Sequence, residues 1–264
     1  HVALSGDGIK DGFSKNHIVL WDAKNDRVAH LIERSEQVTN LLFRSDVLIA
    51  IDQNSISFYD PLGFYQKAEI SISSPCFSCA VASTASRWLV AYPSSRGDGI
   101  TFSDYHDPTE ILGQIRVNDV MFYAFDRKGE LLAVVSNEGR VITLWSVPTL
   151  SLISTYKRGI RSCQVFSLSF DALSSYFVLA TTRGTLHAFA IPTPAERRDL
   201  NPSQQLKSQI QYEGLPKGEY LLQCQFDVAG YIMIGVTNMG RWIQLKLDIE
   251  NNRLDVISQH SLDM

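Results

Sequence analysis

VMFYAFDRKGELLAVVSNEGRVITLWSVPTLSLISTY, residues 120–156, is a run of short apolar segments separated by tight turns. The turn sequences Asp126-Arg127-Lys128-Gly129 and Ser136-Asn137-Glu138-Gly139 place glycine where a hairpin needs a positive φ. Between the turns, β-branched and aromatic residues predict strands over 120–125, 131–135, 140–145 and 152–156. The stretch therefore predicts one antiparallel unit of four strands.

The strand at 141–145 has counterparts along the whole chain. Six segments end in a similar apolar and aromatic pattern: Ile18–Asp22, Ile56–Asp60, Ile100–Asp104, Val141–Trp145, Leu186–Phe189 and Trp242–Leu245. A spacing of about 40 residues is typical of propeller blades, and helix signals are nearly absent. We expect an all-β, WD-repeat-like β-propeller that forms a single domain over residues 1–264. Six blades are visible, and we expect a first blade upstream of His1 to bring the total to seven, with residues 1–8 as an inner strand.

The segment 192–208 departs from this strand pattern. Pro192, Pro194, Pro202 and several charged residues predict an exposed loop inside the sixth blade of the full propeller. After it, residues 209–213 are expected to resume as the outer strand.

Composition excludes several classes of function. The chain has 264 residues and a net charge of −4, so it is not a basic nucleic-acid binder. It contains no run of about 18 apolar residues that would predict a membrane-spanning helix. Four scattered cysteines, Cys76, Cys79, Cys163 and Cys224, fit a reducing compartment and give no zinc spacing. Because no nucleophile elbow, metal motif or P-loop is present, we expect neither an enzyme nor a cofactor.

A pair of neighbouring cations carries the strongest functional signal. Lys157 and Arg158 follow the strand at 152–156, and adjacent strand residues point to opposite faces. The two cations can therefore serve two different pockets. Both side chains bind phosphate, Arg through a planar fork and Lys as a point charge. Hydroxyls and an imidazole, at 181–187, supply the polar partners that a phosphorylated sugar-like ring needs.

The chain resembles the PROPPINs, which are seven-bladed β-propellers that bind phosphoinositides and act in autophagy. The resemblance rests on Leu89–Pro93, on Gly129–Ala133, on Gln259–Asp263 and above all on Tyr156-Lys157-Arg158-Gly159, which stands where the family has Phe/Leu-Arg-Arg-Gly. The position of this motif, before the Ser167–Phe170 strand, makes the match more specific than the four residues alone.

The resemblance implies two headgroup sites on the propeller rim. The second site would comprise Arg158, Arg161, Ser162, Thr181, Thr182, Thr185 and His187, all of which match the family's pattern. The first site would comprise Lys157, Arg116, Ser136, Arg140 and Thr143, with several departures. In particular, the acidic Glu138 stands where a lysine is common, which weakens phosphate binding unless Glu138 pairs with Arg140. If His187 is charged, binding is expected to strengthen toward mildly acidic pH.

A membrane-inserting loop is the third contact that the resemblance implies. The matching segment, 192–208, carries the cations Arg197, Arg198 and Lys207 and the apolar residues Leu200 and Leu206. Its cations suit an anionic surface, although its apolar content is low and it is shorter than the resemblance implies.

Taken with its resemblance, the sequence predicts a monomeric membrane effector. Its ligands would be phosphatidylinositol 3-phosphate or the 3,5-bisphosphate, and it would recruit autophagy or trafficking proteins. It would act in the cytoplasm, peripherally on preautophagosomal, endosomal or vacuolar membranes. The alternative is a propeller that binds only proteins and whose lipid sites have decayed, as Lys157 and Glu138 would permit.

Overall fold

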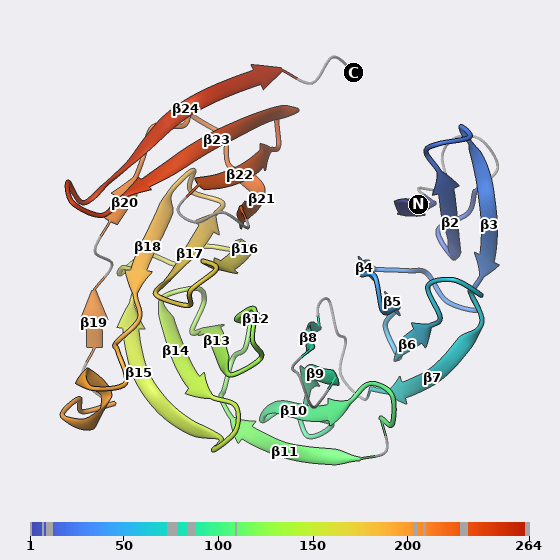
Figure 1. The fold of residues 1–264 in the computed structure, drawn as a ribbon, viewed down its shortest axis with the longest axis horizontal. Coiled ribbons are helices and arrows are strands. Elements are labelled where there is room, and N and C mark those ends of the chain that lie inside the picture. Colours follow the sequence, from blue (N-terminus) through green and yellow to red (C-terminus); the bar gives the residue numbers. More distant parts are fainter. Residues whose placement is uncertain are drawn as a thin grey trace. The chain divides into compact units, whose positions relative to one another are not determined.

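The computed structural model describes residues 2–6, 8, 13–72, 79–83, 88–108, 110–202, 205–207, 210–227 and 232–261. Cys76, Ser208 and residues 262–263 lie outside this part. Within it the chain forms six sheets and no α-helix, and thus no helix that could cross a bilayer. Contacts divide the chain into two units, His1–Ala80 with Arg87–Arg116 and Val81–Ser86 with Val117–Met264 (Figure 1).

The first three sheets along the chain are antiparallel, as expected of propeller blades. The first contains β1 (Val2–Ser5), β2 (His17–Asp22) and β3 (Arg27–Glu33). The second contains β4 (Asn40–Phe43), β5 (Leu48–Ile51), β6 (Ser55–Tyr59) and β7 (Gln66–Ser71). The third contains β8 (Ala80–Ser83), β9 (Trp88–Pro93), β10 (Gly99–Asp104) and β11 (Ile111–Arg116).

The remaining sheets belong to the second unit. One contains β12 (Phe122–Phe125), β13 (Leu131–Ser136), β14 (Val141–Ser146), β15 (Ser151–Lys157) and β19 (Gln205–Lys207). The next contains β16 (Val165–Phe170), β17 (Tyr176–Thr181), β18 (Leu186–Ala190) and β20 (Ile210–Tyr212). The last contains β21 (Leu221–Phe226), β22 (Ile232–Thr237), β23 (Arg241–Asp248) and β24 (Arg253–Ser261).

The β12–β15 sheet confirms the unit predicted from residues 120–156, with strand ends shifted by one or two residues. All six residues of β13 are buried, because both faces of this central strand are covered. The β13–β14 turn requires Gly139, whose φ is +77° and whose added Cβ would lie 2.5 Å from the carbonyl oxygen of Cys163. The turn is thereby held against the connection that leads from β15 to β16.

An aromatic cluster joins the β12–β15 sheet to the β16–β20 sheet. Tyr156 is only 1% exposed and packs edge-on against Phe177 and Phe189. Its hydroxyl donates a hydrogen bond of 3.0 Å to the carbonyl oxygen of Ala190, so the buried polar atom is satisfied. Because Tyr156 directly precedes Lys157, this packing fixes where the basic pair leaves the sheet.

The structure differs from the expected exposed loop over 205–207. These residues form β19, which pairs in parallel with β15 and puts the backbone of Lys207 opposite that of Lys157. Leu206 packs against the aromatic cluster and is half-buried. The outer edge of β15 would otherwise leave backbone groups unpaired, and the backbone of β19 pairs with it there. The rest of the loop contains a short 3₁₀ helix, η1 (Glu196–Arg198), and the outer strand then resumes as β20, as predicted.

Candidate functional site

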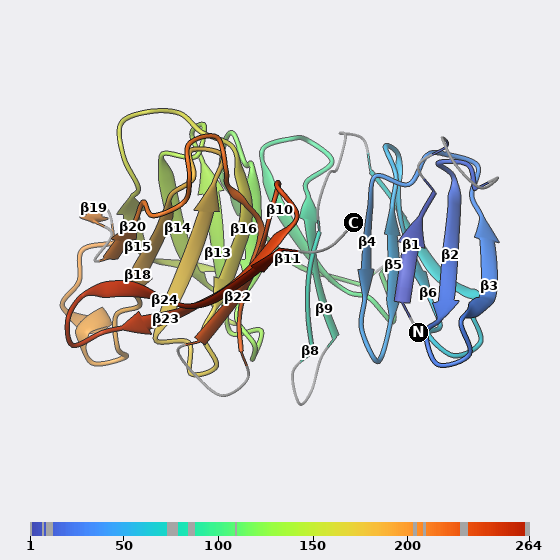
Figure 2. The same cartoon turned by 90° about the horizontal axis from the view of Figure 1, so that it is seen from above.

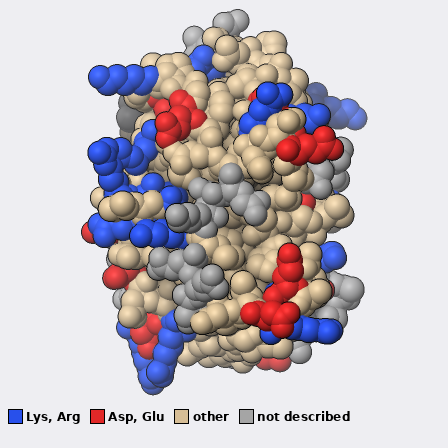
Figure 3. Space-filling model, turned by 90° about the vertical axis from the view of Figure 1, so that its left-hand side faces the viewer, with Lys and Arg blue, Asp and Glu red and all other residues tan. Residues whose placement is uncertain are grey.

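Most of the predicted site residues lie at one end of the sheets of the second unit. In an antiparallel sheet the second and fourth strands end on the same side, so the β13–β14 turn and the β15–β16 connection share that end. Strand β16 begins there, and the β17–β18 turn therefore lies there as well (Figure 2). Figure 3, which faces the outer strands of this unit, shows Lys and Arg side chains gathered along one side.

The two cations of the motif serve different faces, as predicted. Lys157 is paired with Val141, which is paired with Ser136, so the Lys157 and Ser136 side chains share one face of the sheet. Arg158 turns the other way. Its Nε donates to the carbonyl oxygen of Gly139 at 2.7 Å, and a terminal guanidinium nitrogen donates to that of Arg161.

Arg158 is buried without an acidic partner. Only 9% of it is exposed, and no carboxylate within the described residues forms an ion pair with it. Two main-chain carbonyls satisfy part of the guanidinium. A buried cation that lacks a counter-charge is unfavourable, and an anion brought beside it is correspondingly stabilised.

A chain of hydroxyls and an imidazole lies in the sheet next to Arg158. The Thr181 and Thr185 hydroxyl oxygens are 2.7 Å apart, and Thr185 Oγ1 is 3.1 Å from His187 Nε2. Thr181 and His187 are 1% and 2% exposed. The Nδ1 atom of His187 is buried and has no hydrogen-bond partner. Thr185 therefore links the other two residues of the predicted second site, Thr181 and His187.

His187 is neutral in the folded protein. Burial, together with the positive charge of Arg158, lowers the pKa of His187 to about 4. The condition for stronger binding in mildly acidic solution, a charged His187, is therefore not met, because desolvation and a like charge both disfavour the imidazolium.

We expect His187 to make no contribution to the pH dependence of anion binding between about pH 5.5 and 7.5. Wild type and His187→Gln should give parallel profiles of binding against pH in vesicle titrations. Any slope they share comes from the phosphate monoester itself, whose second ionisation lies near pH 6. A wild-type profile that steepens toward acid relative to the variant would contradict a neutral His187.

The first unit contains a second arginine in the position of Arg158. Arg34 follows β3 as Arg158 follows β15, and both are buried. The Arg34 N–H donates to the Asn16 carbonyl before β2, and the Arg158 N–H donates to the Arg140 carbonyl before β14, both at 2.9 Å. The next sheet also corresponds in each case, since the Asp52 N–H donates to the Ser55 carbonyl and the Thr181 N–H donates to the Thr185 carbonyl.

The two arginines differ in the charge that faces them. Arg34 forms an ion pair of 2.5 Å with Asp52 and donates to the hydroxyls of Ser55 and Ser57 at 2.9 and 2.6 Å. By strand register, Asp52, Ser55 and Ser57 correspond to Thr181, Thr185 and His187. Thr181 thus replaces a carboxylate by a neutral hydroxyl. The chain itself supplies an anion beside Arg34, whereas none of the described residues supplies one beside Arg158.

The residues predicted for the first site are only partly brought together. Ser136 and Lys157 share a face, and Lys157 is exposed with no acidic partner within the described residues. The Thr143 hydroxyl accepts a hydrogen bond of 2.9 Å from the Trp145 indole. Arg140 pairs with Glu138, so its charge is largely neutralised. Arg116 ends β11 in the first unit, whereas the other four residues belong to the second.

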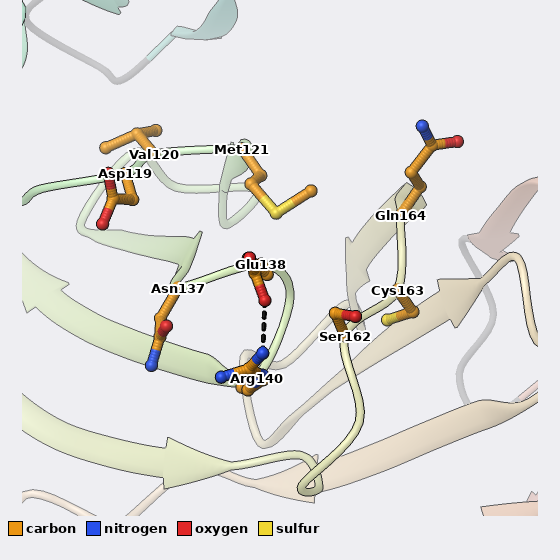
Figure 4. A pocket seen from close by; sticks show the side chains of 9 residues that line it. All are labelled: Asp119, Val120, Met121, Asn137, Glu138, Arg140, Ser162, Cys163 and Gln164. Atoms are coloured by element: carbon orange, nitrogen blue, oxygen red, sulfur yellow. Dashed lines mark hydrogen bonds and ion pairs between the residues drawn. The ribbon is translucent and has the colours of Figure 1, made fainter.

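A cavity of about 690 Å³ opens at the same end of the second unit. It is lined by Asp119, Val120, Met121, Asn137, Glu138, Arg140, Ser162, Cys163 and Gln164 (Figure 4). The Glu138–Arg140 pair lies on one side of it, and residues 162–164 lie on another. Of the predicted site residues, only Arg140 and Ser162 contribute to this wall. Arg158, Thr181, Thr185 and His187, hereafter the Arg158 cluster, do not line the cavity, which opens at the same end of the unit.

The remaining residues of the second site lie on the rim of this cluster. Arg161 and Ser162 are exposed, and Thr182 is half-buried. The Thr182 hydroxyl accepts a hydrogen bond of 3.2 Å from the Gln164 N–H, an interaction that sequence reasoning missed. The correspondence between Arg34 and Arg158 was missed as well. Superposing the strand ends of the six repeats would have revealed it.

The predicted membrane loop is less available than expected. Leu206 lies in β19 and packs against the hydrophobic core, and Leu200 is half-buried. The Arg197 side chain donates a hydrogen bond of 2.8 Å to the Pro192 carbonyl oxygen, whereas Arg198 is exposed. Lys207 is placed only by the backbone of β19. Among the side chains that the structure describes in this segment, Arg198 is the exposed cation, and Leu200 and Leu206 are each half-buried.

Several curated proteins are 21–25% identical to this chain over the part that they match, and no family model matches it. SVP1-like protein 2 of Neurospora crassa is 22% identical over 205 residues, which cover 75% of this chain and 46% of that protein. Autophagy-related protein 18 of Schizosaccharomyces pombe is 25% identical over 222 residues, which cover 70% and 60%. The chain thus spans about half the length of the curated relatives it matches.

Solved structures establish the fold. Hsv2 of Kluyveromyces lactis matches with a TM-score of 0.71 at 15% identity, covering 94% of this chain and 80% of that one. KlAtg21, in a complex with the coiled-coil of AgAtg16, matches with a TM-score of 0.80 at 14% identity, covering 99% and 81%. The fold is therefore that of a β-propeller. The names of these relatives and the Tyr-Lys-Arg-Gly motif at 156–159 agree with the resemblance to the PROPPIN family.

Proposed function

We propose that the protein binds phosphoinositide headgroups at a membrane surface, with the Arg158 cluster as its principal site. One phosphate would lie beside the Arg158 guanidinium, where Asp52 lies beside Arg34 in the first unit. Thr181, Thr185 and His187 would hydrogen-bond to the phosphate or to the ring hydroxyls, and Arg161 and Ser162 would contact the ligand from the rim. The ligand class is phosphatidylinositol 3-phosphate or the 3,5-bisphosphate.

The observation that supports this proposal most strongly is the missing counter-charge. Of the two arginines buried in the described part of the chain, Arg34 has a carboxylate and Arg158 has none. A charge-assisted hydrogen bond is worth roughly 1.5–3 kcal/mol. Two or three such bonds give about micromolar capture, which membrane attachment through a second contact can strengthen.

Partner recruitment is the second part of the proposal. A relative is named for autophagy, and KlAtg21 was solved with a coiled-coil of AgAtg16, so we infer that this protein also carries autophagy or trafficking proteins to its membrane. It would act as a monomer on the cytoplasmic surface of preautophagosomal, endosomal or vacuolar membranes. The second unit's basic side faces the lipid in this arrangement (Figure 3).

We expect Arg158→Ala to weaken binding to vesicles that contain phosphatidylinositol 3-phosphate by about ten- to a hundredfold. Lys157→Ala should weaken it by less than about fivefold, because Lys157 is exposed and its site is incomplete. Flotation of the two variants beside wild type, each shown by circular dichroism to be folded at the assay temperature, measures the difference.

The first site is the weaker candidate, since Glu138 neutralises Arg140. A protein-only scaffold remains the alternative function. Equal flotation of wild type on neutral and on 3-phosphorylated vesicles, or none on either, would favour that scaffold. A larger loss for Lys157→Ala than for Arg158→Ala would instead move the principal site to the other face of the sheet.

A further inference from the structure

The connection between β15 and β16 presents an exposed isoleucine beside the Arg158 cluster. Ile160 is 83% exposed, two residues after the buried Arg158. Lys157 before it and Arg161 after it are exposed cations. The segment therefore offers one large apolar side chain between two positive charges, on the same end of the sheet as the proposed phosphate position.

This connection is fixed by the fold. The Arg158 guanidinium donates to the carbonyl oxygen of Arg161, and the Cys163 N–H donates a hydrogen bond of 3.0 Å to the Glu138 carbonyl oxygen. Gln164 and Thr182 exchange two hydrogen bonds, of 3.0 and 3.2 Å. These contacts fasten both ends of the segment, so Ile160 is held out into solvent.

Exposure alone does not distinguish Ile160. Leu62 and Leu173 are 87% and 71% exposed, and single apolar residues on a surface are ordinary. The setting of Ile160 is different, because exposed cations flank it and a buried arginine without a counter-charge among the described residues precedes it by two positions. Anionic lipid attracts such cations, and an apolar side chain among them can enter the boundary between headgroups and acyl chains.

The expected insertion loop leaves this role open. Its Leu206 is paired in β19 and packed against the aromatic cluster, and its Leu200 is half-buried. Within the described residues near the Arg158 cluster, Ile160 is the apolar side chain that faces solvent most fully.

We propose that Ile160 inserts into the lipid bilayer while Arg158 holds a phosphoinositide headgroup. Lys157 and Arg161 would lie at the level of the anionic headgroups on either side of it. The proposal rests on the proposed function and assigns to the same site its apolar contact with the membrane. It predicts that binding depends on Ile160 only when the ligand is part of a bilayer.

Comparing vesicles with a soluble headgroup separates the contribution of Ile160 insertion from that of headgroup binding. For Ile160→Ser we expect about tenfold weaker binding to phosphatidylcholine vesicles containing phosphatidylinositol 3-phosphate. Binding of soluble inositol 1,3-bisphosphate, measured by calorimetry, should be unchanged. Ile160→Leu should retain vesicle binding. Leu173→Ser is the matched control, because Leu173 is similarly exposed but lies in the β16–β17 turn at the opposite end of the strands.

Fluorescence reports the insertion directly. The emission of Ile160→Trp should shift to the blue when the vesicles are added and should be quenched by brominated acyl chains, whereas Leu173→Trp should show neither effect. Intact headgroup binding with undiminished vesicle binding by Ile160→Ser would overturn this inference alone. Failure of wild type to bind the soluble headgroup and the vesicles would overturn the proposed function and this inference together.

Discussion

Thr181→Asp is expected to reduce binding to phosphatidylinositol 3-phosphate vesicles by about a hundredfold or more without lowering the thermal stability of the protein. The substitution gives Arg158 the carboxylate that Arg34 already has in Asp52. The new side chain would occupy the position proposed for the phosphate and repel that phosphate. Vesicle titration and a thermal melt of the same preparation measure both parts of the expectation.

The local backbone suits an aspartate at this position. The Asp52 carboxylate accepts hydrogen bonds from the N–H groups of Asn54 and Ser55 at 2.8 and 2.7 Å. At the corresponding turn, the Thr181 hydroxyl already accepts one from the Arg183 N–H at 3.3 Å. Although burial opposes ionisation, the Arg34 guanidinium and the turn hold the pKa of Asp52 below its usual value. We expect the same of an aspartate at 181.

Thr181→Asn is the matched control, since asparagine has the shape of aspartate and no charge. It should retain most of the affinity that Thr181→Asp loses. Similar losses in both variants would show that position 181 acts through packing, and full binding by Thr181→Asp would place the phosphate elsewhere.

The repeated strands were the part of this structure that the sequence made predictable. A glycine-containing turn and a period-two apolar pattern act locally, so the strands of residues 120–156 could be placed to within one or two residues. The opposite directions of Lys157 and Arg158 also follow from strand geometry alone. The grouping of Thr181, Thr185 and His187 came from the family resemblance, and strand register accounts for it.

The partners of individual polar groups were not predictable, because they depend on the register between sheets. Strand β19 is only three residues long, and no turn signal or apolar periodicity in the sequence predicts it. The Thr143 hydroxyl is used by Trp145, and burial suppresses the charge on His187. Arg34 and Asp52 are 18 residues apart and meet only when two sheets pack. Their pairing nevertheless makes the unpaired state of Arg158 interpretable.

Arg34→Ala is expected to lower the free energy of unfolding by about 3–5 kcal/mol, the largest stability effect in this set. The variant would leave the Asp52 carboxylate, which is 2% exposed, buried without its cation. Urea denaturation followed by tryptophan fluorescence measures the change. Arg253→Ala is the control. Its ion pairs with Asp248 and Asp255 are exposed, so it should cost less than about 1 kcal/mol.

Arg158→Ala should destabilise the protein by less than Arg34→Ala does, although both arginines are buried and follow equivalent strands. Removing Arg158 leaves two main-chain carbonyls without a donor, whereas removing Arg34 leaves a charge. Removing both Arg34 and Asp52, as in Arg34→Met with Asp52→Leu, should recover most of the loss. Equal destabilisation by the two single variants would mean that Arg158 has an equally strong counter-charge, and the case for an anion from outside would then be lost.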